Sequence, residues 1–266
     1  MHRITSRSNA HYKSWIHLLR SRERKKSGLF LIEGFRELSR ALKAKVDLVE
    51  LILTETAIAH STTSEWLSAL PEKLISYVLP DDLFKTLSVR EHPDGFLGVA
   101  QLKTSTADTW VPNPNGLYLL VERLEKPGNL GALMRSAEAT AVDAVLIADP
   151  CVDLFNPHVI RASQGAVFQV PTYCQSADEL LTRLNATRLA LWAATPRAQR
   201  TYWDCDFTQG SVICIGNEAS GLQPIWFERA TPMVIPMYGQ SADSLNASVA
   251  GTLCLYEAQR QRHLRS

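Results

Sequence analysis

The stretch EKPGNLGALMRSAEA (Glu125–Ala139) decides the fold class, because it takes the chain from the apolar run LYLLV (Leu117–Val121) through a polar turn into a helix-forming sequence. Two later stretches also place Asn, Glu or Ser beside Gly after apolar residues: ICIGNEASGL (Ile213–Leu222) and IPMYGQSADSLNASVAGTLCLYEA (Ile235–Ala258). Open α/β sheets bind ligands at the carboxyl ends of their strands. The three stretches therefore predict one shared site.

Continuous apolar runs in the C-terminal half predict strands that are buried on both faces, as in a parallel sheet covered by helices. Helix-forming segments are expected between them, at Gly131–Thr140 and near Asn156–Gln164. This half is therefore predicted to be a mostly parallel, doubly wound α/β domain. Its further strands are expected at AVLIAD (Ala144–Asp149), VFQVPTY (Val167–Tyr173), RLALWAAT (Arg188–Thr195) and SVICIG (Ser211–Gly216).

The N-terminal third alternates between helix and strand patterns and predicts a smaller α/β/α unit. Its Pro, Gly, Ser, Thr, Asn and Asp residues then cluster in KTSTADTWVPNPNG (Lys103–Gly116), which is typical of a linker. We therefore expect an N-terminal domain at 1–105, a linker at 106–115 and a C-terminal domain at 116–266. The N-terminal helices are expected near His11–Arg24, Phe35–Ala44 and Ser64–Leu70, and the strands near Phe30, Leu48–Thr54 and Ile75–Leu79.

Composition places the chain among soluble globular proteins, with 266 residues of which 45% are hydrophobic and 21% charged. No apolar stretch approaches the roughly 20 residues of a membrane-spanning helix, so a membrane role is not expected. The five cysteines are widely spaced and form no metal-binding pattern. They are interpreted as small buried thiols in a reducing cytosol, and no metal is expected. The Arg- and Ser-rich N-terminus is interpreted as a folded cytosolic start in preference to a transit peptide.

Positive charge is concentrated at the front of the chain. Met1–Lys45 contains twelve Lys or Arg against three Asp or Glu, whereas Val46–Trp110 contains four against ten. A basic cluster of this kind can neutralise phosphates, which is the sequence-independent part of nucleic-acid binding. A solvated helix face explains a run of charges equally well, and both readings stay open on charge alone. The cluster comprises Arg20, Arg22, Arg24, Lys25 and Lys26.

A dinucleotide-binding enzyme is the main alternative for a doubly wound domain. The chain contains neither G-x-G-x-x-G nor G-x-x-x-x-G-K-[ST]. The nearest segment, Gly216–Gly221, carries the carboxylate of Glu218 in its turn, and a carboxylate there would repel a pyrophosphate. The sequence therefore argues against a dinucleotide.

Taken together, PGNLGALMRSAEA, IGNEASGL and IPMYGQSADSLNASVAGTLCLYEA resemble, in order and spacing, the three motifs of the SpoU (TrmH-like) branch of the SPOUT RNA methyltransferases. The text ITSRSNAHYKSWIHLLRSRERKKSGLFLIEGFREL similarly resembles the L30e-like substrate-binding domain that precedes the catalytic domain in many members. The resemblance implies transfer of a methyl group from S-adenosylmethionine to a ribose 2′-hydroxyl of RNA. It also implies a trefoil knot and a homodimer in which each site is completed across the interface.

The resemblance assigns catalytic roles to five residues. Arg135 matches the arginine that binds RNA phosphate and assists deprotonation of the hydroxyl; since a guanidinium stays protonated, stabilising the developing alkoxide is its expected task. Helix capping is the alternative for Asn129, Ser244 and Asn246, and a surface salt bridge is the alternative for Arg135. Glu218 could instead satisfy backbone donors in its turn. The predicted catalytic set is Asn129, Arg135, Glu218, Ser244 and Asn246.

Cofactor contacts are expected to come largely from loop backbone at positions within or near the motifs. The predicted set is Ala194, Thr195, Gly216, Asn217, Ile235, Met237 and Leu245. YGQSAD (Tyr238–Asp243) is one residue longer than the resemblance predicts, and Ala247 stands where Val is common. Neither change removes a polar group that the reaction needs. Ribosomal RNA is expected as the substrate, with transfer RNA, or a non-catalytic RNA-binding assembly protein on the same fold, as the alternatives.

Overall fold

The chain folds into two compact units in this computed structural model, which describes residues 1–59, 66–68, 70, 71, 73–102, 110–239 and 243–264. Unit 1 comprises Met1–Thr104 and Asp153–Gln169, and unit 2 comprises Ser105–Val152 and Val170–Ser266. Unit 1 thus takes in a segment from within the predicted C-terminal domain. The domain limits derived from the sequence stay a prediction, and residues 103–109 of the linker region lie outside the described residues.

Unit 1 is built on a mixed sheet in the order β1-β4-β3-β5-β2. Strands β1 and β3 run parallel to β4, whereas β5 is antiparallel to both β3 and β2. Three of these strands agree with the predicted ones, and β1 and β5 were not predicted. The strands are β1 (His2–Arg3), β2 (Leu29–Glu33), β3 (Leu48–Thr54), β4 (Ile75–Leu79) and β5 (Phe96–Gln101).

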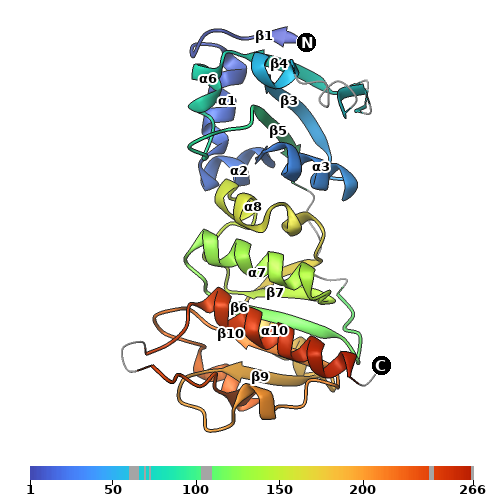
Figure 1. Ribbon diagram of the computed structural model, residues 1–266, viewed down its shortest axis with the longest axis vertical. Coiled ribbons are helices and arrows are strands. Elements are labelled where there is room, and N and C mark those ends of the chain that lie inside the picture. Colours follow the sequence, from blue (N-terminus) through green and yellow to red (C-terminus); the bar gives the residue numbers. More distant parts are fainter. Residues whose placement is uncertain (60–65, 69, 72, 103–109, 240–242, 265–266) are drawn as a thin grey trace. The chain divides into compact units, whose positions relative to one another are not determined.

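Helices cover both faces of this sheet (Figure 1). On one face, Trp15 and Leu18 of α1 and Phe84 of α6 join a buried core with Ile52 and Tyr77. Helix α3 packs on the other face, where Gly98 leaves room for Leu38. Helical segments of unit 1 with bounds inside the described residues include α1 (Ala10–Leu18), α2 (Ser21–Ser27), α3 (Phe35–Lys43), α4 (Glu55–Ile58), α6 (Asp81–Lys85), α8 (Pro157–Ser163) and η2 (Ala166–Phe168).

The single helix predicted near His11–Arg24 is wrong, because two helices, α1 and α2, occupy this stretch. Arg20 has an extended backbone and separates them, and the Arg24 guanidinium donates a hydrogen bond to the Leu18 carbonyl oxygen at 2.8 Å. A cation at a helix C-terminus satisfies a carbonyl that the helix itself leaves free. The predicted helix at Ser64–Leu70 lies partly outside the described residues.

Unit 2 is built on six strands, all parallel, in the order β11-β9-β10-β6-β7-β8. This confirms the predicted parallel α/β sheet. The run Val167–Tyr173 is not one strand as predicted, since it contains η2 before β8 begins. The trefoil knot stays a prediction. The strands are β6 (Leu117–Glu122), β7 (Ala144–Ala148), β8 (Thr172–Gln175), β9 (Ala190–Ala194), β10 (Ser211–Ile215) and β11 (Thr231–Met233).

The two faces of the second sheet bury different helices. Leu180 and Leu184 of α9 (Ala177–Asn185) and Trp226 of η4 (Pro224–Glu228) pack in one core with Leu120. On the other face, α7 (Pro127–Ala139) packs against α10 (Ala247–His263), and the short segment η3 (Tyr202–Asp204) precedes β10. The sheet is therefore covered on both sides, as a doubly wound fold requires.

Helix α7 begins four residues earlier than predicted, because Pro127 occupies its first turn. Proline suits that position, since its fixed backbone angle is already helical and its missing N–H would have no partner there. The earlier start puts Asn129 inside the helix. Gly251 of α10 faces this helix, and a Cβ there would lie 2.5 Å from Leu133. The two helices can therefore approach closely.

The cysteines depart in part from their predicted burial. Cys205, Cys214 and Cys254 are buried, whereas Cys151 and Cys174 are exposed. All five belong to unit 2. No helix within the described ranges has the length and apolar character needed to cross a membrane.

Candidate active site

A cavity of about 790 Å³ opens in unit 2, and its walls come from loops that follow three neighbouring parallel strands, β11, β9 and β10. The end of β9 and the loop after it contribute Ala194–Arg197, and the loop after β10 contributes Gly216–Leu222. The site therefore lies at the carboxyl ends of the strands, where the sequence predicts it. Segments after β11 complete the wall, with Val234, Ile235, Met237, Asp243, Ser244 and Leu245.

All seven residues of the predicted cofactor set line this cavity. They are Ala194, Thr195, Gly216, Asn217, Ile235, Met237 and Leu245. Of the predicted catalytic set, Glu218 and Ser244 also line it. The structure thus brings the second and third motifs together around one space, although they are separate in the sequence.

The first motif reaches the other two through side-chain amides. Asn129 of α7 donates a hydrogen bond from Nδ2 to Oε1 of Glu218. The Nδ2 of Asn246 donates to Oδ1 of Asn129 at 3.0 Å. Asn129 is buried, so losing either partner would leave a polar atom without a hydrogen bond. One residue from each motif therefore belongs to a single hydrogen-bonded chain.

The alternatives drawn from the sequence can now be separated. Asn129 does not cap α7, whose N-cap residue is Lys126. Asn246 does cap α10, since its Oδ1 accepts from the Ser248 amide at 2.9 Å, but its Nδ2 remains available for Asn129. In the turn after β10, it is Asn217 that accepts from the amides of Ala219 and Ser220, not Glu218.

Arg135 lies on α7, is exposed, and does not line the cavity. Within the described ranges it makes no ion pair, so the surface salt bridge considered from the sequence is not formed there. Six residues separate it from Asn129, which turns its side chain about 240° around the helix. The structure therefore places Arg135 apart from the hydrogen-bonded chain of Asn129.

Sequence reasoning missed the residue that anchors the loop after β10. Glu122, at the end of β6, is fully buried and accepts hydrogen bonds from the backbone N–H and the side-chain amide of Gln223, each at 2.7 Å. The Trp226 indole N–H donates a third, also at 2.7 Å. Three donors compensate a buried carboxylate for its lost hydration. The sequence feature that could have pointed to Glu122 is a single acidic residue at the end of an otherwise apolar strand.

Gly216 allows the cavity wall to close. A Cβ at this position would lie 2.3 Å from the backbone of Gly221 and Leu222, so no other residue fits without moving that loop. Asn217 also ties the loop to the start of the first stretch, since its Nδ2 donates to Oε1 of Glu125 at 3.2 Å and to the carbonyl oxygen of the preceding Arg123 at 2.9 Å. Backbone groups and apolar side chains thus form much of a wall suited to holding an adenosine. The residues present fit S-adenosylmethionine.

The buried thiols of unit 2 are not candidates for nucleophiles. Burial raises the pKa of Cys205 to about 11 and that of Cys254 to about 12. Burial also raises the pKa of Cys214. Only thiolates are strong nucleophiles, and these groups stay protonated near neutral pH. The chemistry of the site must therefore come from its other polar groups.

The predicted basic cluster lies on and just before α2 in unit 1, and it divides into two parts. Arg20, Arg22, Lys25 and Lys26 are exposed. Arg24 is buried, and its Nη2 lies 2.6 Å from Oδ2 of Asp153. A buried, paired guanidinium cannot neutralise an RNA phosphate, which corrects the role predicted for Arg24.

The fold and the cavity define a doubly wound α/β protein with a ligand site at the carboxyl ends of parallel strands, joined to a second α/β unit. Residues 116–256 match the model of the SpoU rRNA Methylase family, and residues 9–98 match that of the MRM3-like substrate binding domain. The first match spans more than half of the chain. The protein therefore belongs to the SpoU rRNA methylase family.

Two characterised relatives cover nearly the whole chain. A 23S rRNA (uridine(2479)-2′-O)-methyltransferase of Streptomyces viridochromogenes is 32% identical over 98% of this chain and 92% of its own. The 23S rRNA (guanosine(2553)-2′-O)-methyltransferase RlmP of Bacillus subtilis (strain 168) is 29% identical over 96% of this chain and 98% of its own.

Solved structures agree with this assignment. A crystal structure of an RNA 2′-O ribose methyltransferase has a TM-score of 0.88 and 41% identity, covering 98% of this chain and 99% of its own. The SpoU methyltransferase AviRb from Streptomyces viridochromogenes, in complex with the cofactor AdoMet, has a TM-score of 0.86 and 28% identity, covering 96% and 98%. The protein is accordingly an RNA methyltransferase that uses S-adenosylmethionine.

Proposed function

We propose that the protein methylates a ribose 2′-hydroxyl of ribosomal RNA, with the catalytic and cofactor roles predicted from the sequence. The observation that carries the proposal is the hydrogen-bonded chain Glu218–Asn129–Asn246 beside the cavity of unit 2. It joins one residue from each motif at the place where all seven predicted cofactor residues meet. Both characterised relatives described above act on 23S rRNA.

S-adenosylmethionine supplies an electrophilic methyl group, so the protein must mainly position the RNA and make a weakly acidic hydroxyl nucleophilic. In this proposal the loops after β9, β10 and β11 hold the cofactor. Asn129 is fixed by hydrogen bonds to Glu218 and Asn246, and it thereby holds the start of α7 beside the loop after β10. Arg135 binds the RNA phosphate and stabilises the developing alkoxide, and Ser244 acts at the rim of the cavity.

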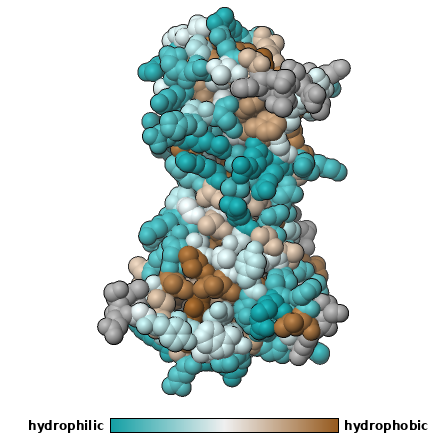
Figure 2. Space-filling model, viewed as in Figure 1, coloured by the Kyte–Doolittle hydropathy of each residue, from teal (hydrophilic) through white to brown (hydrophobic). Residues whose placement is uncertain are grey.

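A homodimer explains how Arg135 can act although it does not line the cavity of its own chain. Helix α10 exposes Val249, Leu253 and Tyr256, with 46%, 37% and 54% of their surfaces open. Their spacing places them on one face of the helix. Figure 2 shows apolar surface gathered where α7 and α10 lie. Two chains that pair through this face would bring Arg135 of one toward the cavity of the other.

We also propose a cytoplasmic location, because the proposed substrate is ribosomal RNA. The two relatives methylate the ribose of different nucleotides, a uridine and a guanosine, so the family relationship does not by itself fix the nucleotide. Ribosomal RNA is preferred to transfer RNA because nearly the whole chain, including unit 1, aligns with these enzymes.

The test is transfer of a labelled methyl group to RNA from a strain that lacks the protein. Naked ribosomal RNA, isolated ribosomal subunits and transfer RNA are offered separately, and the labelled nucleotide is mapped. Label on a ribose 2′-oxygen of ribosomal RNA is expected. Label on transfer RNA alone would overturn the substrate. Absence of label from all three, with a folded protein that binds S-adenosylmethionine, would favour a non-catalytic RNA-binding role.

A further inference from the structure

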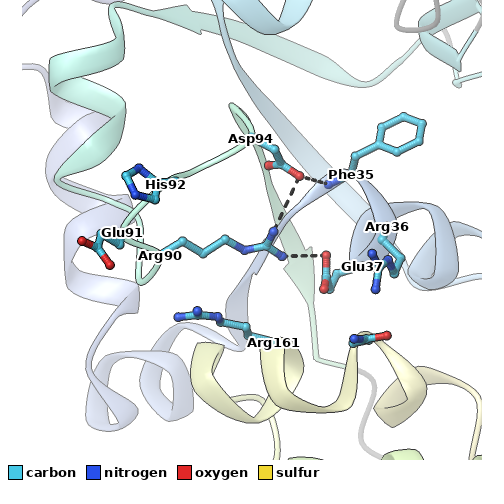
Figure 3. Close-up of a pocket in the computed structure, with 9 residues that line it drawn as sticks. Phe35, Arg36, Glu37, Arg90, Glu91, His92, Asp94 and Arg161 are labelled. Carbon is cyan, nitrogen blue, oxygen red and sulfur yellow. Dashed lines mark hydrogen bonds and ion pairs between the residues drawn. The ribbon is translucent and has the colours of Figure 1, made fainter.

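A cavity of about 620 Å³ in unit 1 is held together by its own ion pairs (Figure 3). Its walls are the first turn of α3, the loop before β5 and helix α8. Arg90 reaches toward α3, where its Nη2 lies 2.8 Å from Oε2 of Glu37, and its Nη1 lies 3.7 Å from Oδ2 of Asp94. The same Asp94 oxygen accepts a hydrogen bond from the backbone N–H of Phe35 at 2.9 Å. These charges compensate one another, so a charged ligand has more to gain in the cavity of unit 2.

Arg197 is the one Lys or Arg among the described residues that line the cavity of unit 2. Its side chain is exposed, and no carboxylate lies within ion-pair distance of it in the described part of the chain. A guanidinium has five N–H donors in a planar fork that matches the two oxygens of a carboxylate. Arg197 therefore offers the cavity a positive charge that no described acidic side chain pairs with.

A turn fixes the backbone of Arg197 just after the end of β9. The Ala198 N–H donates to the Thr195 carbonyl oxygen at 3.3 Å, and the Arg197 N–H donates to Thr195 Oγ1 at 3.4 Å. Pro196 occupies the second position of the turn, which its fixed backbone angle suits. The Thr195 N–H donates to the Met233 carbonyl oxygen of β11 at 2.9 Å. The guanidinium is thus carried by a turn that is tied to the sheet.

The cofactor and this lining have complementary charges. S-adenosylmethionine carries a positive sulfonium, a positive α-ammonium group and one negative group, its α-carboxylate. The described lining carries two carboxylates, those of Glu218 and Asp243, and the cation of Arg197. Opposite charges attract more strongly where water is partly excluded. Arg197 therefore suits the only anionic group that the cofactor has.

An RNA phosphate is the other anion that could meet Arg197. An RNA strand brings a negative charge with every nucleotide, and Glu218 and Asp243 in the same wall would repel it. The cofactor brings its own positive groups, which these carboxylates would attract. Arg197 also lies two residues after Thr195, which belongs to the predicted cofactor set. The surroundings of Arg197 therefore favour the carboxylate of the cofactor.

We infer that Arg197 binds the α-carboxylate of S-adenosylmethionine. The inference rests on the proposed function, because it takes the cavity of unit 2 as the cofactor site. The carboxylate is remote from the transferred methyl group and is unchanged in the product, so the contact is equally strong before and during methyl transfer. Arg197 therefore contributes to cofactor affinity and to the selection of ligands that keep the carboxylate, and it does not contribute to kcat.

The experiment is calorimetric titration of the full-length protein with S-adenosylmethionine and with its decarboxylated form, which lacks only the carboxylate. Arg197→Gln is expected to raise the Kd for S-adenosylmethionine about 10-fold, as loss of a charge-assisted hydrogen bond does. The Kd for the decarboxylated form should change less than about twofold, since the group that Arg197 contacts is already absent. Arg197→Lys keeps the charge without the fork and should give a smaller loss. Arg200→Gln is the matched control, because Arg200 is exposed in the same loop but does not line the cavity.

Other readouts separate a carboxylate contact from a structural role. In steady-state methyl transfer to RNA, Arg197→Gln should raise the KM for S-adenosylmethionine while kcat and thermal unfolding match wild type. An equal loss of affinity for both ligands would overturn the inference. An unchanged Kd for S-adenosylmethionine would also overturn it, and weaker RNA binding in the same variant would assign Arg197 to an RNA phosphate. Wild-type protein that binds the cofactor but transfers no methyl group to RNA would overturn the proposed function and leave the carboxylate contact standing.

Discussion

The cavities of the two units have walls of different kinds. The cavity of unit 2 is walled by loops that follow parallel strands, with much of its surface formed by backbone and apolar groups. That of unit 1 is walled by charged side chains from a helix turn, a loop and α8. A cofactor that never varies can be held by fixed backbone and one charged contact, whereas the ion pairs of Arg90 hold the walls of the unit 1 cavity together, so we expect RNA to bind the exposed cations of α2 instead. Cofactor binding and RNA binding should therefore respond to different substitutions.

The largest effect is expected from Arg135→Ala in unit 2. If Arg135 stabilises the alkoxide, methyl transfer should fall by about 1000-fold, as when an oxyanion-stabilising donor is removed. The Kd for S-adenosylmethionine should stay within about twofold, because Arg135 does not line the cavity. Single-turnover transfer and calorimetric titration measure the two quantities.

Glu138→Ala is the matched control for Arg135→Ala, since it removes an exposed charge from the same helix. It should transfer methyl groups at the wild-type rate. A large loss of cofactor affinity in Arg135→Ala would place this arginine in cofactor binding instead of catalysis.

The second effect concerns stability and belongs to unit 1. Arg24→Met leaves Asp153 without its buried partner, which should destabilise unit 1 by about 3 kcal/mol. Denaturant unfolding followed together with thiol labelling can locate the loss, because every cysteine lies in unit 2. Unit 1 of Arg24→Met is expected to unfold at a lower denaturant concentration than unit 1 of the wild type, without new labelling of the cysteines. Lys25→Met, at the exposed neighbouring position, should unfold like wild type.

Polar residues show how far the sequence could predict this molecule. The apolar runs of β6, β7 and β10 predict strands that the structure buries. Residues of the second and third motifs line the cavity of unit 2, whereas Arg135 of the first motif does not, and the roles of all these residues stay predictions. Arg22 and Arg24 cannot be distinguished in the sequence, because the difference between them arises only in the folded protein, where Asp153 pairs with Arg24. Phe35 and Arg36 lie in the stretch that resembles the substrate-binding domain, but Arg161 lies outside every quoted stretch, so the cavity that the three line could not be foreseen. The role of Glu122 in anchoring the loop after β10 could not be predicted, because a single acid at the end of an apolar strand matches no motif.

A third prediction tests the corrected basic cluster of unit 1. Replacing Arg22, Lys25 and Lys26 with Gln should weaken binding to ribosomal RNA and reduce the slope of log K against log salt by about 2, since each lost phosphate contact contributes about 0.7. The charge-matched triple Lys13→Gln, Lys43→Gln and Lys73→Gln removes exposed charges elsewhere in unit 1. If both triples change the slope equally, the cluster on α2 is an ordinary solvated surface.

The smallest effect is a pH dependence in unit 2. Burial raises the pKa of Cys205 to about 11 and of Cys254 to about 12, whereas an unfolded thiol titrates near its ordinary value. Above that value the unfolded chain loses protons that the folded chain keeps, so the free energy of unfolding falls as pH rises, by about 1 kcal/mol per thiol at pH 10.

The double variant Cys205→Ala, Cys254→Ala isolates this contribution, since other groups titrate equally in both proteins. Between pH 8 and pH 10 it should lose about 2 kcal/mol less stability than wild type. Cys151→Ala, at an exposed thiol, should follow wild type throughout. Identical curves for all three proteins would show that the buried thiols titrate normally.

Unit 1 is built from two separate segments of the chain, so its folding during synthesis must wait for the second segment. Its first part ends at Thr104, but Asp153, which pairs with Arg24, and Phe155, whose ring lies 4.5 Å from that of Phe30, are made only after part of unit 2. At synthesis rates of 5–20 residues per second the delay is roughly 2–10 s. During that time the carboxylate that compensates the burial of Arg24 in the finished unit has not yet been made. The N-terminal unit therefore cannot complete its folding first, although it is synthesised first.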